Sequence, residues 1–593
     1  MTHRAGRLVL SVLAGLGLAL LATGPARAVI NGTTWFPIGP APSCCFFPGG
    51  EGGRATSVAV NPANGFEIYI GTANGGVWRS TDQAATWTAL SDDQASLAIG
   101  SIALADCTDQ GCDRVYAGTG ENAIRRDTYY GRGLLVGQRQ SLSGGGGMQW
   151  TLRTGTPYTF GRGSISNVVL DPTTGGTSRR IFVALSSGVT ASATESTVTA
   201  PQVVVSFNGP TAFKSVVDYG LYKSETDGVT WTKLTVAGIT GDRPTDLEMD
   251  PTNHNILYAG FLGKGLFKSV NNGIDWCPLG PGFPRGSCPI SNGLPDHAAV
   301  DFDHVEVAID PSNTSHLYAS LGHCDDPLLE QCRPSVYEST DAGLNWSLRY
   351  QGGPAIADST DCPAAYSRYT HSLTVYPADA GTVYLGGVRL CKSIDHGANW
   401  SAADANTLGG STHLDHHAVV FDAVGFRGYD VNDGGIAVWQ YPGTTWTPKN
   451  QGIQALAFQG IAVSPRTPRI LGGMQDNGGT LWTGAKQWDH MPCCGDGGFS
   501  VMDSGDPLKM WITTNAGSVG STTVVPMRST SGGAFFTEVS NGIPDAEPRS
   551  FYPPMIQVAG SGTAGNTLYF GTQRLWRSTD DGGNWSPVSP VLS

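Results

Sequence analysis

Apolar and polar residues alternate with a period of two in short runs, and Gly, Pro, Asn and Asp separate the runs. This alternation puts successive side chains on opposite faces of a strand, and the separating residues favour turns. A recurring unit contains an apolar strand that ends in Asn-Pro or Asp-Pro, a turn, and a second strand that ends at Gly. Clear examples are Val58–Thr72, Leu247–Gly260 and Val307–Ser320. The pattern predicts an all-β protein built from antiparallel strand pairs.

An eight-residue motif lies downstream of these strand pairs and recurs six times. Its clearest copies, Ser578–Trp585, Ser339–Trp346 and Ser393–Trp400, read STDDGGNW, STDAGLNW and SIDHGANW, and looser copies are Ser80–Trp87, Ser224–Trp231 and Ser269–Trp276. Asp accepts hydrogen bonds from its own turn, Gly supplies a positive φ, and Trp buries a large ring below the turn. One active site does not need six copies, so the motif is interpreted as a structural turn.

Four antiparallel strands in each repeat of roughly 40–60 residues predict the blades of a β-propeller. Ten units are counted, with first strands that begin near Thr56, Ile99, Ile165, Asp246, His304, Thr370, Leu414, Phe458, Gly498 and Phe551. No long polar linker divides the chain, which favours a single ten-bladed ring over the alternative of two smaller propellers. The segment Thr33–Ile38 is expected to add a closing strand to the last blade.

The S-x-D-x-G-x-x-W turn resembles the Asp box, or BNR repeat, of sialidases, of xyloglucan-degrading glycoside hydrolases and of the sortilin luminal domain. The resemblance covers essentially the whole mature chain and implies a propeller fold; ten blades in one ring would resemble sortilin. It carries little information about function, because one fold hosts many activities.

The N-terminus has the features of a secretory signal peptide. Arg4 and Arg7 precede an apolar run, Leu8–Leu21, and Ala26–Ala28 reads AlaArgAla. Residues 1–28 are therefore predicted to be removed, leaving the propeller over residues 29–593. No other apolar run approaches membrane-spanning length, so a secreted or periplasmic protein without a membrane span is expected.

Composition indicates which partners are excluded and whether the cysteines are oxidised. The net charge of −13 and the pI near 5.3 argue against nucleic acid as a partner. Twelve cysteines in an exported chain favour disulfides. Local pairing is expected for Cys107–Cys112, Cys277–Cys288, Cys324–Cys332 and Cys362–Cys391, and the remaining neighbours Cys44 and Cys45 are expected to bridge to Cys493 and Cys494.

Candidate site residues are sought on one face of the propeller. The loops that enter the first strand of a blade share a face with those that leave the second strand, and three consecutive blades place histidines there. The predicted catalytic residues are Asp433, Asp476, Asp496 and His416. The predicted substrate-binding residues are Arg54, Arg162, Glu121, Gln475 and His371.

Two chemistries fit these residues. Paired carboxylates could act as general acid and base on a glycosidic bond. Alternatively His304, His413 and Asp415 could hold a divalent cation. Imidazole together with carboxylate suits Zn or Mn, whereas an oxygen-rich set of ligands suits Ca. In a polysaccharide lyase such a cation would acidify the proton next to a uronate carboxylate. Side chains alternate along the strand at His413–His417, so only part of that run can converge.

The known active sites of the resembling families do not transfer. Sialidases need an arginine triad with an Arg-Ile-Pro segment, which this chain lacks. The xyloglucanase-type enzymes resemble the chain at Thr72–Arg79, where Ala73 occupies the position of their early catalytic Asp. The sequence thus predicts an exported carbohydrate-active propeller that cleaves a polysaccharide or glycoside. The alternative is a non-catalytic, sortilin-like binding propeller, which would have an apolar and aromatic lining instead of converging titratable groups.

Overall fold

The computed structural model describes residues 37–592 except 45–48, 125–127, 141–146, 189–217, 284–285, 287, 297–301, 324–330, 353–361, 364, 367, 405–411, 492–494, 516–523 and 559–565. The predicted signal peptide, residues 1–28, lies outside this range. None of the described helical segments is long and apolar enough to cross a membrane.

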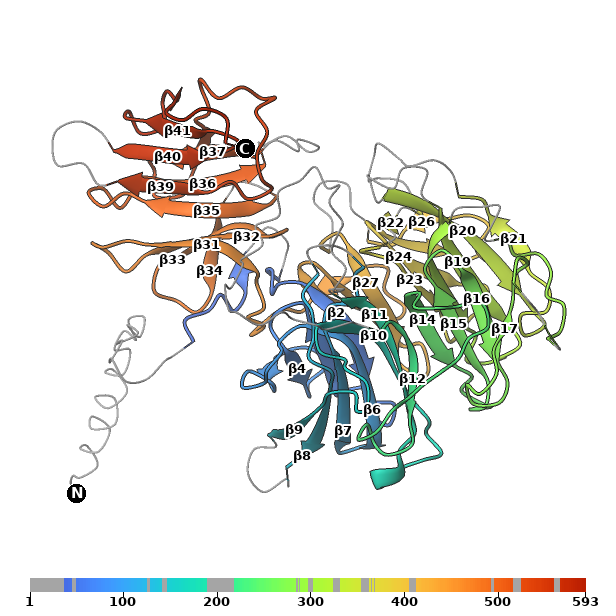
Figure 1. The fold of residues 1–593 in the computed structure, drawn as a ribbon. Helices are drawn as coiled ribbons and strands as arrows, with labels where there is room; N and C mark the ends of the chain where they lie inside the picture. Colours follow the sequence, from blue (N-terminus) through green and yellow to red (C-terminus); the bar gives the residue numbers. More distant parts are fainter. Residues whose placement is uncertain are drawn as a thin grey trace, which may run out of the picture.

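The described chain folds into ten antiparallel sheets whose strands are neighbours in chain order (Figure 1). The first five are β2 (Ala55–Val60), β3 (Ile68–Thr72), β4 (Val77–Ser80), β5 (Thr88–Ala89); β6 (Ile99–Thr108), β7 (Gly111–Thr119), β8 (Leu134–Arg139), β9 (Met148–Arg153); β10 (Gly163–Leu170), β11 (Ile181–Gly188), β12 (Gly220–Ser224), β13 (Thr232–Lys233); β14 (Pro244–Met249), β15 (Leu257–Phe261), β16 (Gly265–Ser269), β17 (Cys277–Pro278); and β18 (Phe302–Ile309), β19 (Leu317–His323), β20 (Gln331–Ser339), β21 (Ser347–Tyr350), with β22 (Ala365–Tyr366) paired to β20.

The other five are β23 (Ser372–Val375), β24 (Val383–Gly386), β25 (Leu390–Ser393), β26 (Ser401–Ala402); β27 (His416–Phe421), β28 (Arg427–Asn432), β29 (Gly435–Gln440), β30 (Thr447–Pro448); β31 (Phe458–Val463), β32 (Ile470–Met474), β33 (Gly478–Trp482), β34 (Trp488–Met491); β35 (Gly497–Met502), β36 (Met510–Asn515), β37 (Val524–Ser529), β38 (Thr537–Glu538); and β39 (Met555–Val558), β40 (Thr567–Gly571), β41 (Leu575–Ser578), β42 (Ser586–Pro587). The 3-10 turn η2 spans Gly176–Ser178. The prediction of an all-β propeller with four-stranded antiparallel blades is confirmed.

The first seven sheets, β2 to β30, close into a ring, which we call the seven-sheet ring. Apolar side chains fill each space between neighbouring sheets, and the last space is filled by residues from the first and the seventh sheets together. There Ile68 and Ile70 pack with Tyr429 and Val431, all fully buried. Strand β2 therefore contacts β27 and β28, although they lie more than 350 residues away in the chain.

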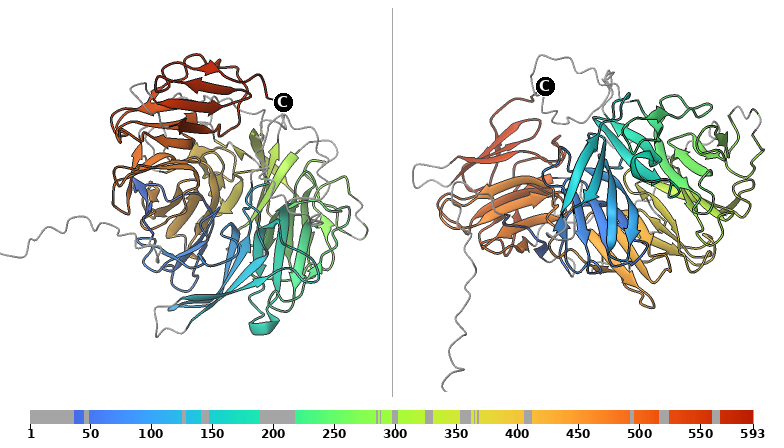
Figure 2. Two further views of the ribbon diagram at one scale, coloured as in Figure 1. Left: turned by 60° about the vertical axis from the view of Figure 1, so that its left-hand side comes forward. Right: turned by 90° about the horizontal axis from the view of Figure 1, so that it is seen from below.

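The last three sheets, β31 to β42, form a separate unit, which we call the three-sheet stack. Leu471 packs against Met510 between its first two sheets, and Trp511 packs against Phe570 between its last two. The stack lies beside the ring and is drawn in orange to red (Figures 1 and 2). The ten sheets thus do not form the single ring that was expected. The repeat pattern counts sheets, but ring closure depends on which two faces pack together, and no local signal reports that.

The N-terminal segment joins the eighth sheet and not the last one. Strand β1 (Ser43–Cys44) pairs in parallel with β34, so that Ser43 lies opposite Trp488. The Trp488 indole N–H donates to the Ile38 carbonyl at 2.9 Å. Residues 33–36 of the expected closing strand lie outside the described range, and the residues that follow tie the chain start to the three-sheet stack.

Each of the six motif copies forms the same turn, which we call a box turn. In Ser339–Trp346 the Ser339 hydroxyl accepts from the Gly343 N–H at 2.9 Å, and the Asp341 carboxylate accepts from the Asn345 N–H at 2.8 Å. The two central residues, Ala342 and Gly343, have φ of 59° and 90°, which explains the preference for Gly. The Trp346 indole donates to the Gly343 carbonyl at 3.0 Å. The six copies are therefore fold elements, as predicted.

A seventh box turn was not recognised in the sequence. In Ser529–Phe536 the Ser529 hydroxyl accepts from the Gly533 N–H at 3.0 Å, and Gly532 and Gly533 have φ of 72° and 96°. Ser531 replaces the Asp and Phe536 replaces the Trp, so the copy escapes a search for the consensus residues.

Three predicted disulfides are present, Cys107–Cys112, Cys277–Cys288 and Cys362–Cys391. Cys44 is also disulfide-bonded, and no cysteine among the described residues is free. Three predicted bridges remain, Cys324–Cys332 and the two that join Cys44 and Cys45 to Cys493 and Cys494. Of their cysteines, Cys45, Cys324, Cys493 and Cys494 lie outside the described residues. The pairing of β1 with β34 places Cys44 opposite Asp489, which is four residues from Cys493.

Asp341→Ala should lower the thermal midpoint without changing the activity of the folded protein. The substitution removes the acceptor for the Asn345 and Ser339 hydrogen bonds, each worth about 1 kcal/mol. Differential scanning calorimetry measures the loss, and Asp92→Ala, at an exposed loop position, is the control. Unchanged stability would show that the box turn does not hold the sheet.

Non-reducing peptide mapping should find Cys44 and Cys45 joined to Cys493 and Cys494. The geometric reason is the pairing of β1 with β34. Free thiols at Cys493 and Cys494, or bridges from them to the three local pairs, would overturn this connectivity.

Candidate functional site

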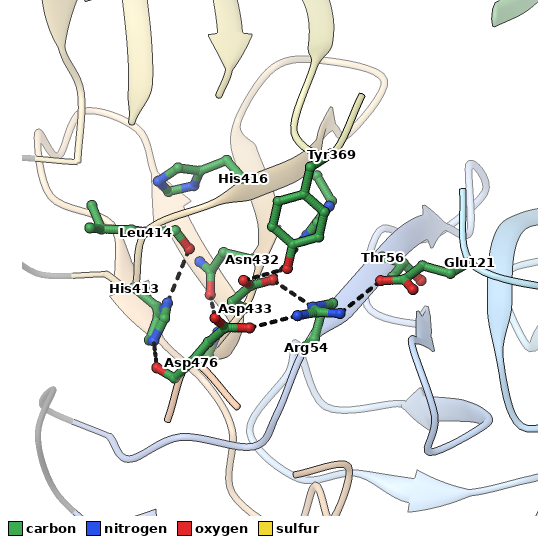
Figure 3. Close-up of polar contacts among 12 residues, drawn as sticks. Arg54, Thr56, Glu121, Tyr369, His413, Leu414, His416, Asn432, Asp433 and Asp476 are labelled. Atoms are coloured by element: carbon green, nitrogen blue, oxygen red, sulfur yellow. Dashed lines mark hydrogen bonds and ion pairs between the residues drawn. The ribbon is translucent and has the colours of Figure 1, made fainter. Parts of the chain in front are cut away.

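Arg54 precedes β2 and bridges three carboxyl groups from distant parts of the chain (Figure 3). Its Nη1 lies 2.9 Å from Glu121 Oε1, its Nε lies 2.9 Å from Asp433 Oδ1, and its Nη2 lies 2.6 Å from Asp476 Oδ2. Glu121 follows β7, Asp433 follows β28 and Asp476 follows β32, so each lies at the exit of a second strand. One guanidinium therefore links the first, second and seventh sheets of the ring to the three-sheet stack. We call these four residues, with Tyr369, the Arg54 cluster.

Asp433 is the fully buried anion of the cluster. Its side chain has no exposed surface, and besides Arg54 it accepts from the Tyr369 hydroxyl at 2.6 Å and contacts His417 Nε2 at 2.7 Å. Burial alone would raise the pKa of Asp433, but Arg54 and His417 outweigh it and hold the pKa below the ordinary value. Asp433, which was predicted to be catalytic, is thus an ionised carboxylate without exposed surface.

Asp476 has the opposite character. Its side chain keeps 22% of its surface exposed. Burial and the neighbouring Asp433 raise its pKa well above the ordinary carboxyl value; Arg54 opposes this shift, and Asp496 adds to it. Three carboxyl groups share one guanidinium, so one of them retains its proton most readily, and we assign that proton to Asp476. A partly exposed carboxylic acid next to a carboxylate can donate a proton to a bound molecule.

The turn between β32 and β33 holds Asp476 in position. Asp476 has φ of 58° and Gly478 has φ of 67°, a left-handed conformation that Asp tolerates better than most residues. The Asp476 N–H donates to Asp496 Oδ1 at 3.0 Å, and His413 Nε2 lies 2.9 Å from the Asp476 carbonyl. The neighbouring Asn477 amide donates to the Asp433 carbonyl at 3.0 Å. These contacts hold the backbone of the turn from both the ring and the stack.

Asp496 is the second partly exposed carboxyl group. It precedes β35, and its Oδ1 also lies 3.5 Å from the Tyr552 hydroxyl. Burial, followed by the charge of Asp496, raises the pKa of Tyr552 above its ordinary value, so Tyr552 stays a neutral donor. Asp476, Asp496 and Tyr552 therefore form a polar group on the stack side of the Arg54 cluster.

Other predicted site residues lie elsewhere. His416 has no exposed surface and is paired with Asp430 at 2.8 Å; burial would lower its pKa, but Asp430 and Asp404 raise it to about 10. A fully buried imidazolium of this kind is a structural ion, so the expected catalytic role of His416 has no support. Arg162 and Gln475 are partly buried, and each donates its backbone N–H, to Gly131 and to Ala457 respectively.

His304 lies near the start of β18, the first strand of the fifth sheet, and His371 directly precedes β23, the first strand of the sixth sheet. Their side chains lie together. Their ring centroids are 5.0 Å apart, His304 Nε2 lies 2.6 Å from Glu306 and His371 Nε2 lies 2.7 Å from the Ser320 hydroxyl. Burial, and then the neighbouring His304, hold the pKa of His371 well below its ordinary value. The predicted metal ligands His304, His413 and Asp415 do not form a group with converging ligand atoms; among the described residues such a group occurs elsewhere, at His316, Glu338 and His396.

The sequence analysis missed two aromatic members of the site. Tyr369 contacts Asp433 and its ring lies 5.0 Å from the Arg54 guanidinium, and Tyr552 contacts Asp496. Both lie within a few residues of a predicted first strand, where only charged and imidazole side chains were considered.

A cavity of about 480 Å³ lies towards the end of the first strands that is opposite to the Arg54 cluster. Its lining comes from β6, β10 and β14 and includes Asn167, Glu248 and His254. It does not include the Arg54 cluster, so the polar chemistry and this cavity are separate features.

The structure is similar to solved GH74 enzymes. An ancestral GH74 enzyme matches with 16% identity, a TM-score of 0.59, and coverage of 95% of this chain and 72% of that chain. The GH74 enzyme of Niastella koreensis matches with 14% identity, a TM-score of 0.56, and coverage of 92% and 74%. The GH74 xyloglucanase of Xanthomonas campestris matches with 16% identity, a TM-score of 0.46, and coverage of 91% and 80%. At such identities the first two likenesses show the fold alone, and the third carries no argument. No family model matches the sequence. No curated protein matches it either.

Arg54→Met should destabilise the protein strongly, by about 3–5 kcal/mol, because it leaves buried carboxylates without their counter-charge. The lowered pKa of Asp433 contributes stability above its unfolded pKa, and this contribution is lost as the pH falls. The destabilisation should therefore be largest near neutral pH and smallest below about pH 4.

Urea unfolding between neutral and acidic pH measures this dependence. Arg466→Met is the matched control, since Arg466 is exposed and donates to the Ser504 carbonyl. A destabilisation that does not change with pH would contradict the ionic role of Arg54.

Proposed function

We propose that this protein is a carbohydrate-active propeller that cleaves a glycosidic bond of a polysaccharide or glycan beside the Arg54 cluster. Asp476 is the general acid and Asp496 is the second carboxyl group. The resemblance of the box turns to those of glycoside hydrolases and the names of the similar structures direct the choice of substrate class.

The observation that carries the proposal is the contrast between the carboxyl groups. Burial and the charge of Asp433 raise the pKa of Asp476, yet its side chain remains 22% exposed. An accessible carboxyl group with a raised pKa is suited to act as a general acid, and Asp496, the second partly exposed carboxyl group, is proposed as its partner. Arg54 and Asp433 set this contrast and do not touch substrate.

The reaction needs one proton to move at each carboxyl group. Asp476 gives its proton to the glycosidic oxygen as the bond from that oxygen to the anomeric carbon breaks. A water molecule adds its oxygen to the anomeric carbon and gives a proton to the Asp496 carboxylate. The Tyr552 hydroxyl, 3.5 Å from Asp496, is in position to orient that carboxylate.

Glycan binding without cleavage is the second candidate. Two observations favour it. Asp433 is buried and ion-paired with Arg54. Ala73, at the position of the early catalytic Asp in xyloglucanase-type enzymes, carries no carboxyl group. The metal-assisted lyase has less support, because His304, His413 and Asp415 do not converge. Three disulfides suit the oxidising, extracytoplasmic location that we propose.

Asp476→Asn should abolish polysaccharide cleavage while the protein stays folded. Asparagine keeps the shape and the hydrogen bonds of the turn but has no proton to give. The purified wild-type protein is screened against xyloglucan, other β-glucans and uronate polysaccharides, with reducing ends as the readout. For the wild type, kcat/KM should fall as the pH rises through the pKa of Asp476, since the acid form is the active one.

Asp496→Asn should reduce cleavage to the same extent, whereas Asp92→Asn, at an exposed site, is the control. Binding of a polysaccharide without release of reducing ends by the wild type would reject cleavage and favour the binding candidate. Cleavage that survives Asp476→Asn would reject the assignment of the general acid.

A further inference from the structure

Two histidines and a glutamate meet on the box-turn side of the ring, away from the Arg54 cluster. His316 immediately precedes β19, and Glu338 lies in β20, one residue before the box turn of the fifth sheet. His396 lies inside the box turn Ser393–Trp400 of the sixth sheet. One ligand atom from each lies within 4.8 Å of the others. The group therefore joins two neighbouring sheets of the ring through side chains that commonly bind metals.

Glu338 Oε1 lies between the two imidazoles. It is 2.8 Å from His316 Nε2 and 2.8 Å from His396 Nδ1. Ligand atoms held about 2.0–2.2 Å from a tetrahedral zinc ion lie roughly 3.3 Å from one another. Moving these side chains apart by a few tenths of an ångström would therefore make room for the ion.

The position of His316 is set by a second carboxylate. Its Nδ1 lies 3.3 Å from Asp310 Oδ2, and its side chain is only 7% exposed. A neutral imidazole has one N–H, so an Nδ1–H donated to Asp310 leaves a lone pair on Nε2, facing the Glu338 carboxylate. A positive centre, either a proton or a metal ion, is needed between them. In zinc sites, a ligating histidine usually donates its other ring N–H to a carboxylate, which fixes the orientation of the ring.

The turn that carries His396 is held rigidly. His396 has φ of 63°, and its backbone N–H donates to the Gly381 carbonyl at 2.9 Å. Arg349 donates from Nε to the His396 carbonyl at 2.9 Å, and its Nε lies 3.6 Å from Glu338 Oε2. Arg349 thus balances one oxygen of Glu338 and leaves the other to the imidazoles. The Tyr318 hydroxyl lies 3.0 Å from His396 Nδ1 and donates to the Ala380 carbonyl.

We propose that His316, Glu338 and His396 bind one Zn²⁺ ion, which clamps the fifth and sixth sheets of the ring together. Two imidazoles and one carboxylate are a ligand set that zinc accepts, with a fourth position left for water. The His396 side chain is 48% exposed, which provides the entry path.

The test uses the full-length mature protein without a polyhistidine tag, stripped with a chelator and then titrated with ZnCl₂. Calorimetry should find one site per chain with micromolar or tighter affinity, and the thermal midpoint should rise with zinc. Ca²⁺ and Mg²⁺ should produce neither effect, because they prefer oxygen ligands.

His396→Ala and Glu338→Gln should each weaken zinc binding about tenfold or more, and the glutamine variant keeps the shape of the side chain if the alanine variant folds poorly. His254→Ala is the matched control, since His254 lies in a turn of the fourth sheet with its Nε2 3.2 Å from the Pro251 carbonyl. Absence of a one-to-one site in the wild type, or equal affinity in all variants, would overturn the proposal and leave the group as a proton-linked ion network. Neither result depends on whether the protein cleaves polysaccharide.

Discussion

The hydrogen bonds and ion pairs of one buried guanidinium connect the two parts of this molecule. Arg54 lies between carboxyl groups of the second and seventh sheets of the ring and of the first sheet of the stack. An unpaired charge in such a place would cost several kcal/mol, so the three carboxyl groups and Arg54 require one another. The carboxyl groups in this arrangement differ in exposure and in pKa. Asp433 is fully buried and ionised, whereas Asp476 is partly exposed and has a raised pKa. The chemistry proposed for the site follows from this difference in burial.

Apolar packing between sheets accounts for the rest of the architecture. A single sheet cannot bury its own two faces, so neighbouring sheets pack against them. The box turn and its Trp lie at one end of the sheet. Closure occurs after seven sheets because Ile68 and Ile70 fit against Tyr429 and Val431. The chain then continues through Ala455 into the stack, and the start of the chain crosses the junction to pair with β34. The junction thus contains both a covalent and a hydrogen-bonded connection beside the Arg54 cluster.

The opposite face of the ring has a different chemistry. The Asp residues of the box turns serve their own backbone, and hydrogen bonds from Asn399 and Ser393 lower the pKa of Asp395 to about 2. His396 occupies a position in this turn where the other five consensus copies have Gln, Asp, Asn or Ala. Among the six, this copy alone has an imidazole there, beside Glu338 and His316. A repeated structural turn can therefore acquire a local function through one substitution while the repeat keeps its fold.

The sequence by itself determined the strands, the number of sheets and the turn chemistry, because these depend on residues close together in the chain. The period-two alternation located the first strands of all ten sheets to within a few residues, and Ser, Asp and Gly at fixed spacing defined the box turns. The entries to first strands and the exits of second strands were also readable, which is why Arg54 was chosen at an entry and Glu121, Asp433 and Asp476 were chosen at exits. Tertiary structure alone decided the division into a seven-sheet ring and a three-sheet stack, since closure joins faces more than 350 residues apart. It also decided that His416 is a buried ion and that Asp433 and Asp476 differ, because burial and the nearest charge set a pKa, and neither is local in sequence.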